Sequence, residues 1–493
     1  MRHQQFLPLA LALLLPTACA QAAPPKPDFA DLPEYLKALN SSTDPEAVAI
    51  HQRITDGPAD LARERIAAEK EGLLTRADQL QQPLPPVDQN AAPLYVQLDA
   101  LRKEKPLHFP MYAQGLNGRY AYTPEQIAVV QREYDARQDI FTLLHEATDK
   151  PQCVFVHTGT NVFYSFPEFA GLRESAREVA TESILLAYQG KYAEAVANQK
   201  RGFHIADQAA SEPLFMNFLT GSAIEAISMD GMQSILQKAG PNSALDKGME
   251  ADILARQAQS NVLTFRHSLT GEPAVDNTEF ERLRQAKPAD IAGQFHPGSP
   301  FLGTHMVSAS ARFTPGEQQQ VGLLVDAAQA ECLRQMREIV AATDLPSPER
   351  QEAFDRDEAQ ALANKSDPIA ALSDQLNFLV TWEATNAAMH TENPIDLPIN
   401  RLETRREVTA AGAAVLAAKA QTGAYPDTLP SQFSDPFTSK RLGYRREGTN
   451  GFVVYSAGPD GTFDGGKPGE RAGVQILFRY PLVPVPVPAE MLK

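Results

Sequence analysis

Apolar residues recur every three or four positions along most of the first 400 residues, a spacing typical of α-helices with one buried face. The stretch from residue 167 to residue 240 is the most regular. Its apolar stripe consists of Leu172, Ala176, Val179, Ala180, Ile184 and Ala187. The pattern predicts a mainly α-helical protein, and a solenoid-like stacking of the helices is one arrangement that it allows.

Breaks in this pattern divide the chain into segments of different character. Proline-rich stretches interrupt the helical spacing, and short strand-like runs begin only after residue 423. We expect a leader over residues 1–22, an N-terminal helical segment and linker over 23–92, a helical body over 93–285, an irregular segment over 286–318, a second helical part over 319–400, a small α+β module over 401–480 and a Pro-rich tail over 481–493.

Local signals mark where some helices begin. Thr123 is a typical N-cap and Pro124 suits the first helical position, so a helix should run from there to about His145. Asn90 predicts the start of a helix that extends through Leu101. His145 and the glutamate after it are interpreted as a pair on the helix surface. Further helices are expected over residues 317–342, 348–364, 367–390 and 402–421.

A helical hairpin is predicted in the middle of the body. Gly190 stands at the turn, Tyr192 follows two residues later, and Ala195 offers a small side chain for close helix packing. This segment resembles the inter-helix turn of a tetratricopeptide repeat, which implies two antiparallel helices. No second copy occurs near a 34-residue period, so we expect one hairpin and not a repeat array.

The first 22 residues resemble a secretory signal peptide. Arg2 and His3 precede an apolar run over residues 6–15, which is shorter than the roughly 20 residues of a membrane-spanning helix. Two processing sites fit. Cleavage after Ala22 would release a soluble chain, whereas processing as a lipoprotein would leave a lipidated Cys19 at the new terminus. We expect an exported periplasmic or envelope protein that is anchored to a membrane only if Cys19 is lipidated.

Export makes the two remaining cysteines relevant. Cys153 and Cys332 could form one long-range disulfide in an oxidising compartment. The alternative is two buried thiols that pack as small apolar side chains. The sequence does not give the distance between the two Cα atoms, on which a disulfide depends.

Charge and motifs exclude several function classes. The formal net charge is −16 and no basic run is present, so nucleic acid is not an expected partner. The chain also lacks the HExxH, GxSxG and SxxK motifs. This favours a non-catalytic scaffold, or a module that binds an envelope protein or peptide. The alternative is a hydrolase whose site is assembled from distant residues.

The last eighty residues contain a series of motifs in a distinctive order, from Gly423-x-Tyr425-Pro426 through Asp435-Pro436-Phe437 and Leu442-x-Tyr444 to Phe452-x-x-Tyr455-Ser456-Ala457-Gly458-Pro459-Asp460-Gly461. Over about residues 401–480 the chain resembles the periplasmic domain of the major pseudopilin of type II secretion. That resemblance implies a long helix on a small antiparallel sheet, followed by a loop that can bind calcium. It also suggests an alternative function as a secretion-system accessory protein.

The resemblance is limited to this module. A pseudopilin has an apolar membrane helix directly before it, whereas here about 400 residues of predicted helical protein precede it. Assembly into a filament is therefore not implied. The helical body itself resembles exported bacterial proteins of uncharacterised function, which implies no activity.

The acidic loop after the last predicted glycine turn is the candidate calcium site. Asp460, Thr462 and Asp464 stand at positions 1, 3 and 5 of an EF-hand-like spacing, with Gly465 at position 6. Glu470 lies one position before the usual bidentate glutamate. The alternative is a turn-rich loop whose aspartates accept hydrogen bonds from their own backbone. No other cofactor is expected.

Overall fold

The computed structural model describes residues 32–106, 120–156, 168–241, 253, 261–287, 312–345, 349–350, 352–354, 367–377, 396–466, 476–481 and 485–486. Several predicted features lie outside the described residues. They are the signal peptide with Cys19, most of the irregular segment 286–318, most of the helix predicted over 348–364, the region 378–395 and Glu470.

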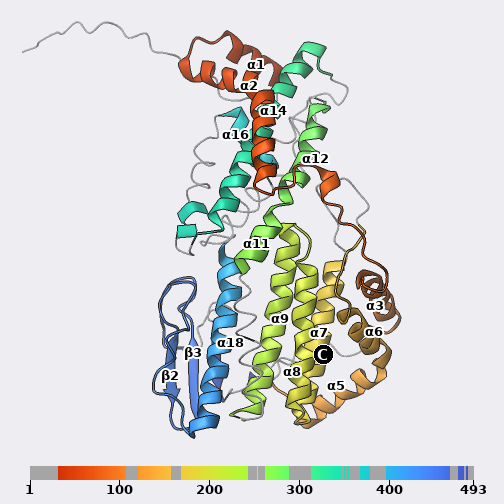
Figure 1. Cartoon of the computed structure of the whole chain (residues 1–493), viewed down its shortest axis with the longest axis vertical. Coiled ribbons are helices and arrows are strands. Elements are labelled where there is room, and N and C mark those ends of the chain that lie inside the picture. Colours follow the sequence, from red (N-terminus) through yellow and green to blue (C-terminus); the bar gives the residue numbers. More distant parts are fainter. Residues whose placement is uncertain are drawn as a thin grey trace, which may run out of the picture.

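The protein is an elongated, mainly helical body with a small sheet at one end (Figure 1). The helices are α1 Leu32–Ser41, α2 Pro45–Lys70, η2 Ala77–Gln79, α3 Ala92–Glu104, α5 Pro124–Ala136, α6 Gln138–Thr148, α7 Glu168–Tyr188, α8 Tyr192–Ala209, α9 Phe215–Ala239, α11 Asn261–Leu269, α12 Glu272–Arg284, α14 Pro315–Ala342, α16 Pro368–Leu376 and α18 Asp396–Thr422. The strands are β1 Tyr120–Ala121, β2 Gly443–Glu447, β3 Gly451–Tyr455, β4 Leu477–Tyr480 and β5 Val485–Pro486. The predicted helical class is confirmed.

One end of the body is built on the contact between α2 and α14, with α1, α12 and α16 packed around them (Figure 1). The two long helices approach closely at Gly57, because a Cβ atom there would lie 2.7 Å from Leu323 O and 2.8 Å from Ala327 N. Only a residue without a side chain fits this crossing.

The other end is a bundle of α7, α8 and α9, flanked by α3, α5 and α6 (Figure 1). The predicted hairpin is present as α7 and α8. Gly190 has a φ of +77°, which favours glycine, and Ala195 is fully buried against the neighbouring helices. Tyr192 is the first residue of α8 and packs partly buried beside α9.

The helix predicted from Thr123 to His145 is two helices. Thr123 does cap α5 and exchanges hydrogen bonds with Gln126 as a capping box. The chain then breaks at Arg137, which is 4% exposed and forms an ion pair with Glu178 on α7. We infer that the break places this guanidinium inward, toward a partner that the local sequence does not reveal.

The C-terminal module consists of α18 against an antiparallel sheet of order β2-β3-β4. Phe452 and Phe478 are fully buried between them, and Gly412 of α18 leaves room for the Phe478 ring. The same hydrophobic cluster includes Ile235 and Leu236 from α9, so the module shares its core with the helical body. Just after this sheet in sequence, β5 pairs in parallel with β1, which lies more than 350 residues earlier in the chain.

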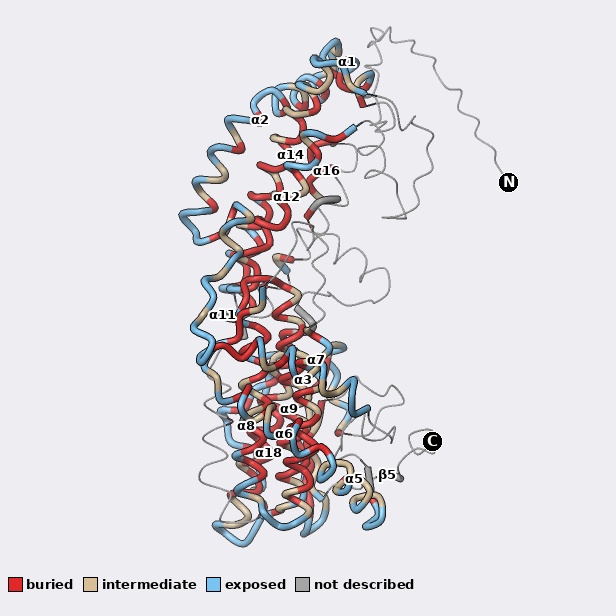
Figure 2. Tube along the Cα trace, turned by 90° about the vertical axis from the view of Figure 1, so that its right-hand side faces the viewer, coloured by how far each residue is buried: buried red, intermediate tan, exposed pale blue. Residues whose placement is uncertain are grey.

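Helix α9 contributes buried side chains to all three hydrophobic clusters of the described chain. Phe218 belongs to the cluster around α2 and α14, Ile224 to the cluster around α3 to α8, and Ile235 to the cluster under the sheet. Figure 2 shows the buried residues continuing along the centre of the elongated body. No helix among the described residues is both long and apolar enough to span a bilayer.

The crossing of α2 and α14 predicts opposite effects for two glycine substitutions. Gly57→Ala should lower the free energy of unfolding by about 1–3 kcal/mol, because the new methyl group meets the backbone of α14. Gly322→Ala, on α14 itself, should raise it by about 0.5–1 kcal/mol, because its Cβ would meet open space and alanine favours the helix. Denaturant unfolding of both variants tests this. Equal stabilities would contradict the close approach.

Candidate functional site

Two carboxylates on α7 stand beside its predicted apolar stripe. Glu178 is 1% and Glu182 6% exposed, and they lie one helical turn apart. Buried carboxylates must be paired or hydrogen-bonded. Sequence analysis did not single them out, although acids at four-residue spacing within an otherwise apolar helix are a signal that could have done so.

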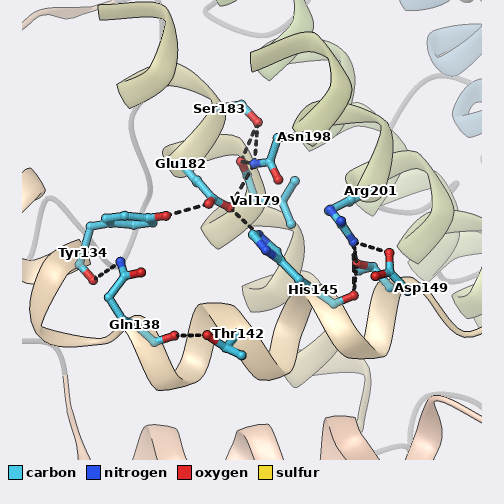
Figure 3. Close-up of polar contacts among 11 residues, drawn as sticks. Tyr134, Gln138, Thr142, His145, Asp149, Val179, Glu182, Ser183, Asn198 and Arg201 are labelled. Carbon is cyan, nitrogen blue, oxygen red and sulfur yellow. Dashed lines mark hydrogen bonds and ion pairs between the residues drawn. The ribbon is translucent and has the colours of Figure 1, made fainter. Parts of the chain in front are cut away.

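Glu182 lies at the centre of a polar network that joins α5, α6, α7 and α8 (Figure 3). Tyr134 donates its hydroxyl hydrogen to Glu182 Oε1 at 2.6 Å. His145 Nε2 lies 2.8 Å from Glu182 Oε2, and Asn198 Nδ2 donates to the same oxygen at 3.0 Å. Near the C-terminus of α6, Arg201 donates a hydrogen bond to the His145 carbonyl at 3.1 Å.

The electrostatics of this network favour a charged Glu182 that is held by neutral and basic hydrogen-bond donors. Burial disfavours the charged form of Glu182, but hydrogen bonds from His145, Tyr134 and Asn198 outweigh it and lower the pKa of the carboxyl. Burial and the nearby Glu182 carboxylate raise the pKa of the Tyr134 hydroxyl above its usual range. Glu182 is therefore a charged acceptor and Tyr134 a neutral donor, and both Glu182 oxygens are occupied.

Glu178 is held by two arginines, Arg102 on α3 and Arg137 at the break between α5 and α6. Arg102 Nη2 lies 2.7 Å from Glu178 Oε2, and Arg137 Nη2 lies 3.3 Å from Glu178 Oε1. Arg102 also donates to Ser175 Oγ at 2.7 Å. Since all three charged side chains are largely buried, removing one partner would leave an uncompensated charge inside the bundle.

The interpretation of His145 as a surface residue is thus corrected in part. Glu146 does lie on the surface, and its Oε1 is 3.6 Å from Lys150 Nζ. His145 turns toward Glu182 because that carboxylate is buried and needs a donor.

An open cavity of about 550 Å³ lies beside the C-terminal half of α8. Its volume falls within the roughly 300–1,000 Å³ of ligand pockets. One wall is the proline-rich segment 82–85 and another is the segment 151–154. The α8 side contributes His204, Asp207 and Gln208, followed by Ser211. Of the cavity lining, the sequence analysis singled out only Cys153, and for another reason, because three separate segments form the cavity.

The polar groups at the α8 wall are fixed by hydrogen bonds. Gln208 is 5% exposed, accepts a hydrogen bond from Tyr95 at 2.7 Å and donates to the Lys150 carbonyl at 3.1 Å. His204 Nε2 lies 2.9 Å from the same carbonyl, which can only accept, so this ring nitrogen carries the hydrogen. The wall is therefore rigid before any ligand binds.

The two cysteines are free and buried. Cys153 lines the cavity and belongs to the cluster around α3 to α8, whereas Cys332 lies in the cluster around α2 and α14. Of the two alternatives from the sequence, the structure has the buried thiols and not the disulfide. Burial, reinforced by Glu212 and Glu168, raises the pKa of the Cys153 thiol, so it is not an activated nucleophile.

The aspartates of the acidic loop 460–466 accept hydrogen bonds from nearby backbone N–H groups, as the turn-rich alternative to a calcium site predicts. Asp460 Oδ1 accepts from Thr462 N at 2.9 Å, and Asp464 Oδ1 accepts from Gly466 N at 3.0 Å. Among the described residues, no group of three or more His, Cys, Asp or Glu side chains could hold a metal ion. Glu470 lies outside the described residues, so calcium binding by this loop stays a prediction.

Glu272 is a buried carboxylate that accepts a backbone hydrogen bond, whereas Glu178 and Glu182 contact basic side chains. It is 4% exposed, and within the described part of the chain its side chain has one hydrogen-bond donor, Phe215 N, at 2.6 Å. Glu272 begins α12 and caps the N-terminus of α9, so it joins two elements. Burial raises its pKa to about 7, although the bond from Phe215 acts in the opposite direction.

This raised pKa predicts a pH dependence of stability. Between about pH 4.5 and 7 the folded protein holds the Glu272 proton more tightly than the unfolded chain, so stability should fall as pH rises through that window. The shift corresponds to a free energy on the order of 3 kcal/mol. Glu272→Gln keeps an acceptor for Phe215 N and should flatten this part of the profile, as measured by melting temperature from pH 5 to 8.

Glu146→Gln, at an exposed glutamate, is the control and should retain the wild-type slope. A Glu272→Gln profile that still falls as steeply as that of the wild type would contradict the assignment.

No family model, no curated protein and no solved structure matches this chain. Its function is therefore inferred from its sequence and from the geometry of the site.

Proposed function

We propose that this protein is an exported, non-catalytic binding module of the cell envelope, and that it holds a peptide or a segment of another protein in the cavity beside α8. The observation that carries the proposal is the open cavity of about 550 Å³ walled by two main-chain segments, 82–85 and 151–154. Walls of this kind offer backbone groups and small apolar surfaces, which suit a polypeptide ligand.

Exposed apolar side chains accompany both walls. Leu84 lines the cavity and is 55% exposed, and Val87 just beyond it is 81% exposed. Val156 follows the second wall and is 62% exposed. Single exposed apolar residues are ordinary, but several that flank one cavity favour an interaction surface.

The chemistry of the cavity supports binding more than catalysis. Its cysteine is a buried thiol with a raised pKa, and Nε2 of its histidine is engaged with a backbone carbonyl. A nucleophilic mechanism needs an activated nucleophile next to a free base. The amide of Gln152 and the hydroxyl of Ser211 are instead neutral hydrogen-bonding groups suited to peptide amides, and Asp207 adds a carboxylate to the same lining.

The test is selection of a phage-displayed dodecapeptide library on the full chain, followed by fluorescence anisotropy with the enriched peptides. Leu84→Asp should weaken binding about tenfold or more, because it places a charge where an apolar ligand side chain would pack. Ile66→Asp is the matched control, since Ile66 is a similarly exposed apolar residue on α2, away from the cavity, and should bind like the wild type.

Two results would contradict the proposal. One is the absence of any enriched sequence. The other is enriched peptides whose affinity is the same for Leu84→Asp and the wild type, which would place their site elsewhere.

A further inference from the structure

We propose that residues 82–87 form a docking segment: an exposed polyproline II helix that binds in an aromatic-lined groove of another protein. The role is separate from that of the cavity, because the protein here presents a segment of its own chain and does not hold one.

Proline restricts the backbone of the docking segment. Pro83, Pro85 and Pro86 each hold φ near about −65°. Gln82 and Leu84 each precede a proline, which disfavours the α-helical region and leaves the extended one. The whole stretch from residue 82 to residue 86 is therefore confined to the polyproline II conformation or to one close to it.

The hydrogen bonds around this stretch agree with that conformation. In the described part of the chain, residues 81–85 take part in no backbone–backbone hydrogen bond, and a polyproline II helix has none of its own. A turn ends the stretch, where Gln89 N donates to Pro86 O at 2.8 Å. At the other end, Gln82 Nε2 donates to Ser211 O at 3.4 Å. The docking segment is thus held extended between two bonded ends, so it loses little entropy when a partner binds.

Burial along the docking segment repeats every three residues, which is the period of a polyproline II helix. One ridge is partly buried and faces the body of the protein, and two ridges are exposed. The partly buried ridge consists of Gln82 and Pro85, and the exposed ridges consist of Pro83 with Pro86 and of Leu84 with Val87.

The exposed ridges indicate the chemistry of the partner. Leu84 is 55% and Val87 81% exposed, and prolines three residues apart flank them. Pro-rich segments with this spacing dock in grooves lined by aromatic side chains. The next residue, Asp88, is exposed and belongs to no ion pair within the residues that the structure describes. A groove of aromatic side chains with a Lys or Arg at one end complements both features.

Site-specific photo-crosslinking of the full chain in the cells that produce it identifies the partner. The photoreactive residue p-benzoylphenylalanine replaces Gln81, which is exposed and lies just outside the docking segment. The matched control carries it at Ile66, which is 69% exposed on α2. We expect a protein that is crosslinked from position 81 and not from position 66. The absence of such a product would overturn the proposal.

The mode of binding is then measured with the purified partner. A synthetic peptide of residues 81–89 contains no aromatic residue, so a change in the partner's tyrosine or tryptophan fluorescence on adding it reports contact with an aromatic groove. In the full chain, Val87→Asp and Asp88→Lys should each weaken binding about tenfold, and Ile66→Asp should bind like the wild type. Unchanged fluorescence, or equal affinity of the wild type and the two variants, would overturn the proposal.

The docking segment and the cavity are distinguished by one variant. Asp88 does not line the cavity, so Asp88→Lys should bind the selected dodecapeptides like the wild type while it loses affinity for the crosslinked partner. Equal losses for both ligands would contradict a separate docking segment. Failure to enrich any dodecapeptide would overturn the function proposed for the cavity alone.

Discussion

The contribution of α9 to all three hydrophobic clusters is the constraint on which the rest of the structure depends. One continuous helix supplies side chains to each of the three hydrophobic clusters, so its rigid geometry sets the spacing between the two ends of the body. Its N-terminus is capped by Glu272, and its middle pairs with α18 through the buried Glu225 and Arg406. The buried positions of α9 tolerate few polar substitutions, whereas its partly exposed stripe already carries Asp230, Gln233 and Gln237.

Buried charges add specificity to this apolar framework. Glu178 and Glu182 on α7 and Glu225 on α9 each meet a basic side chain from a helix far away in sequence. Such pairs contribute little net stability compared with apolar packing, but an alternative packing that separated them would leave charges unpaired in the core. We infer that these contacts select one arrangement among several ways of packing similar amphipathic helices.

The cavity depends on the same framework. On the α8 side, Gln208 and His204 are hydrogen-bonded to the Lys150 carbonyl, just after the end of α6. On the side of residues 151–154, the Asn90 side chain is hydrogen-bonded to the backbone of Val154, and the Asn90 backbone forms a bridge with Gln152. A site prepared in this way loses little entropy when a ligand binds.

The sequence by itself determined the local structure: the helical class, the cap at Thr123, the turn at Gly190 and the presence of short strands after residue 423. These features depend on residues within a few positions of one another, so periodicity and turn chemistry reveal them. The break at Arg137, the partner of His145 and the cavity depended on contacts between residues 37 or more positions apart. Only the tertiary structure decided them, because the burial that makes a carboxylate recruit a histidine exists only once the helices have packed.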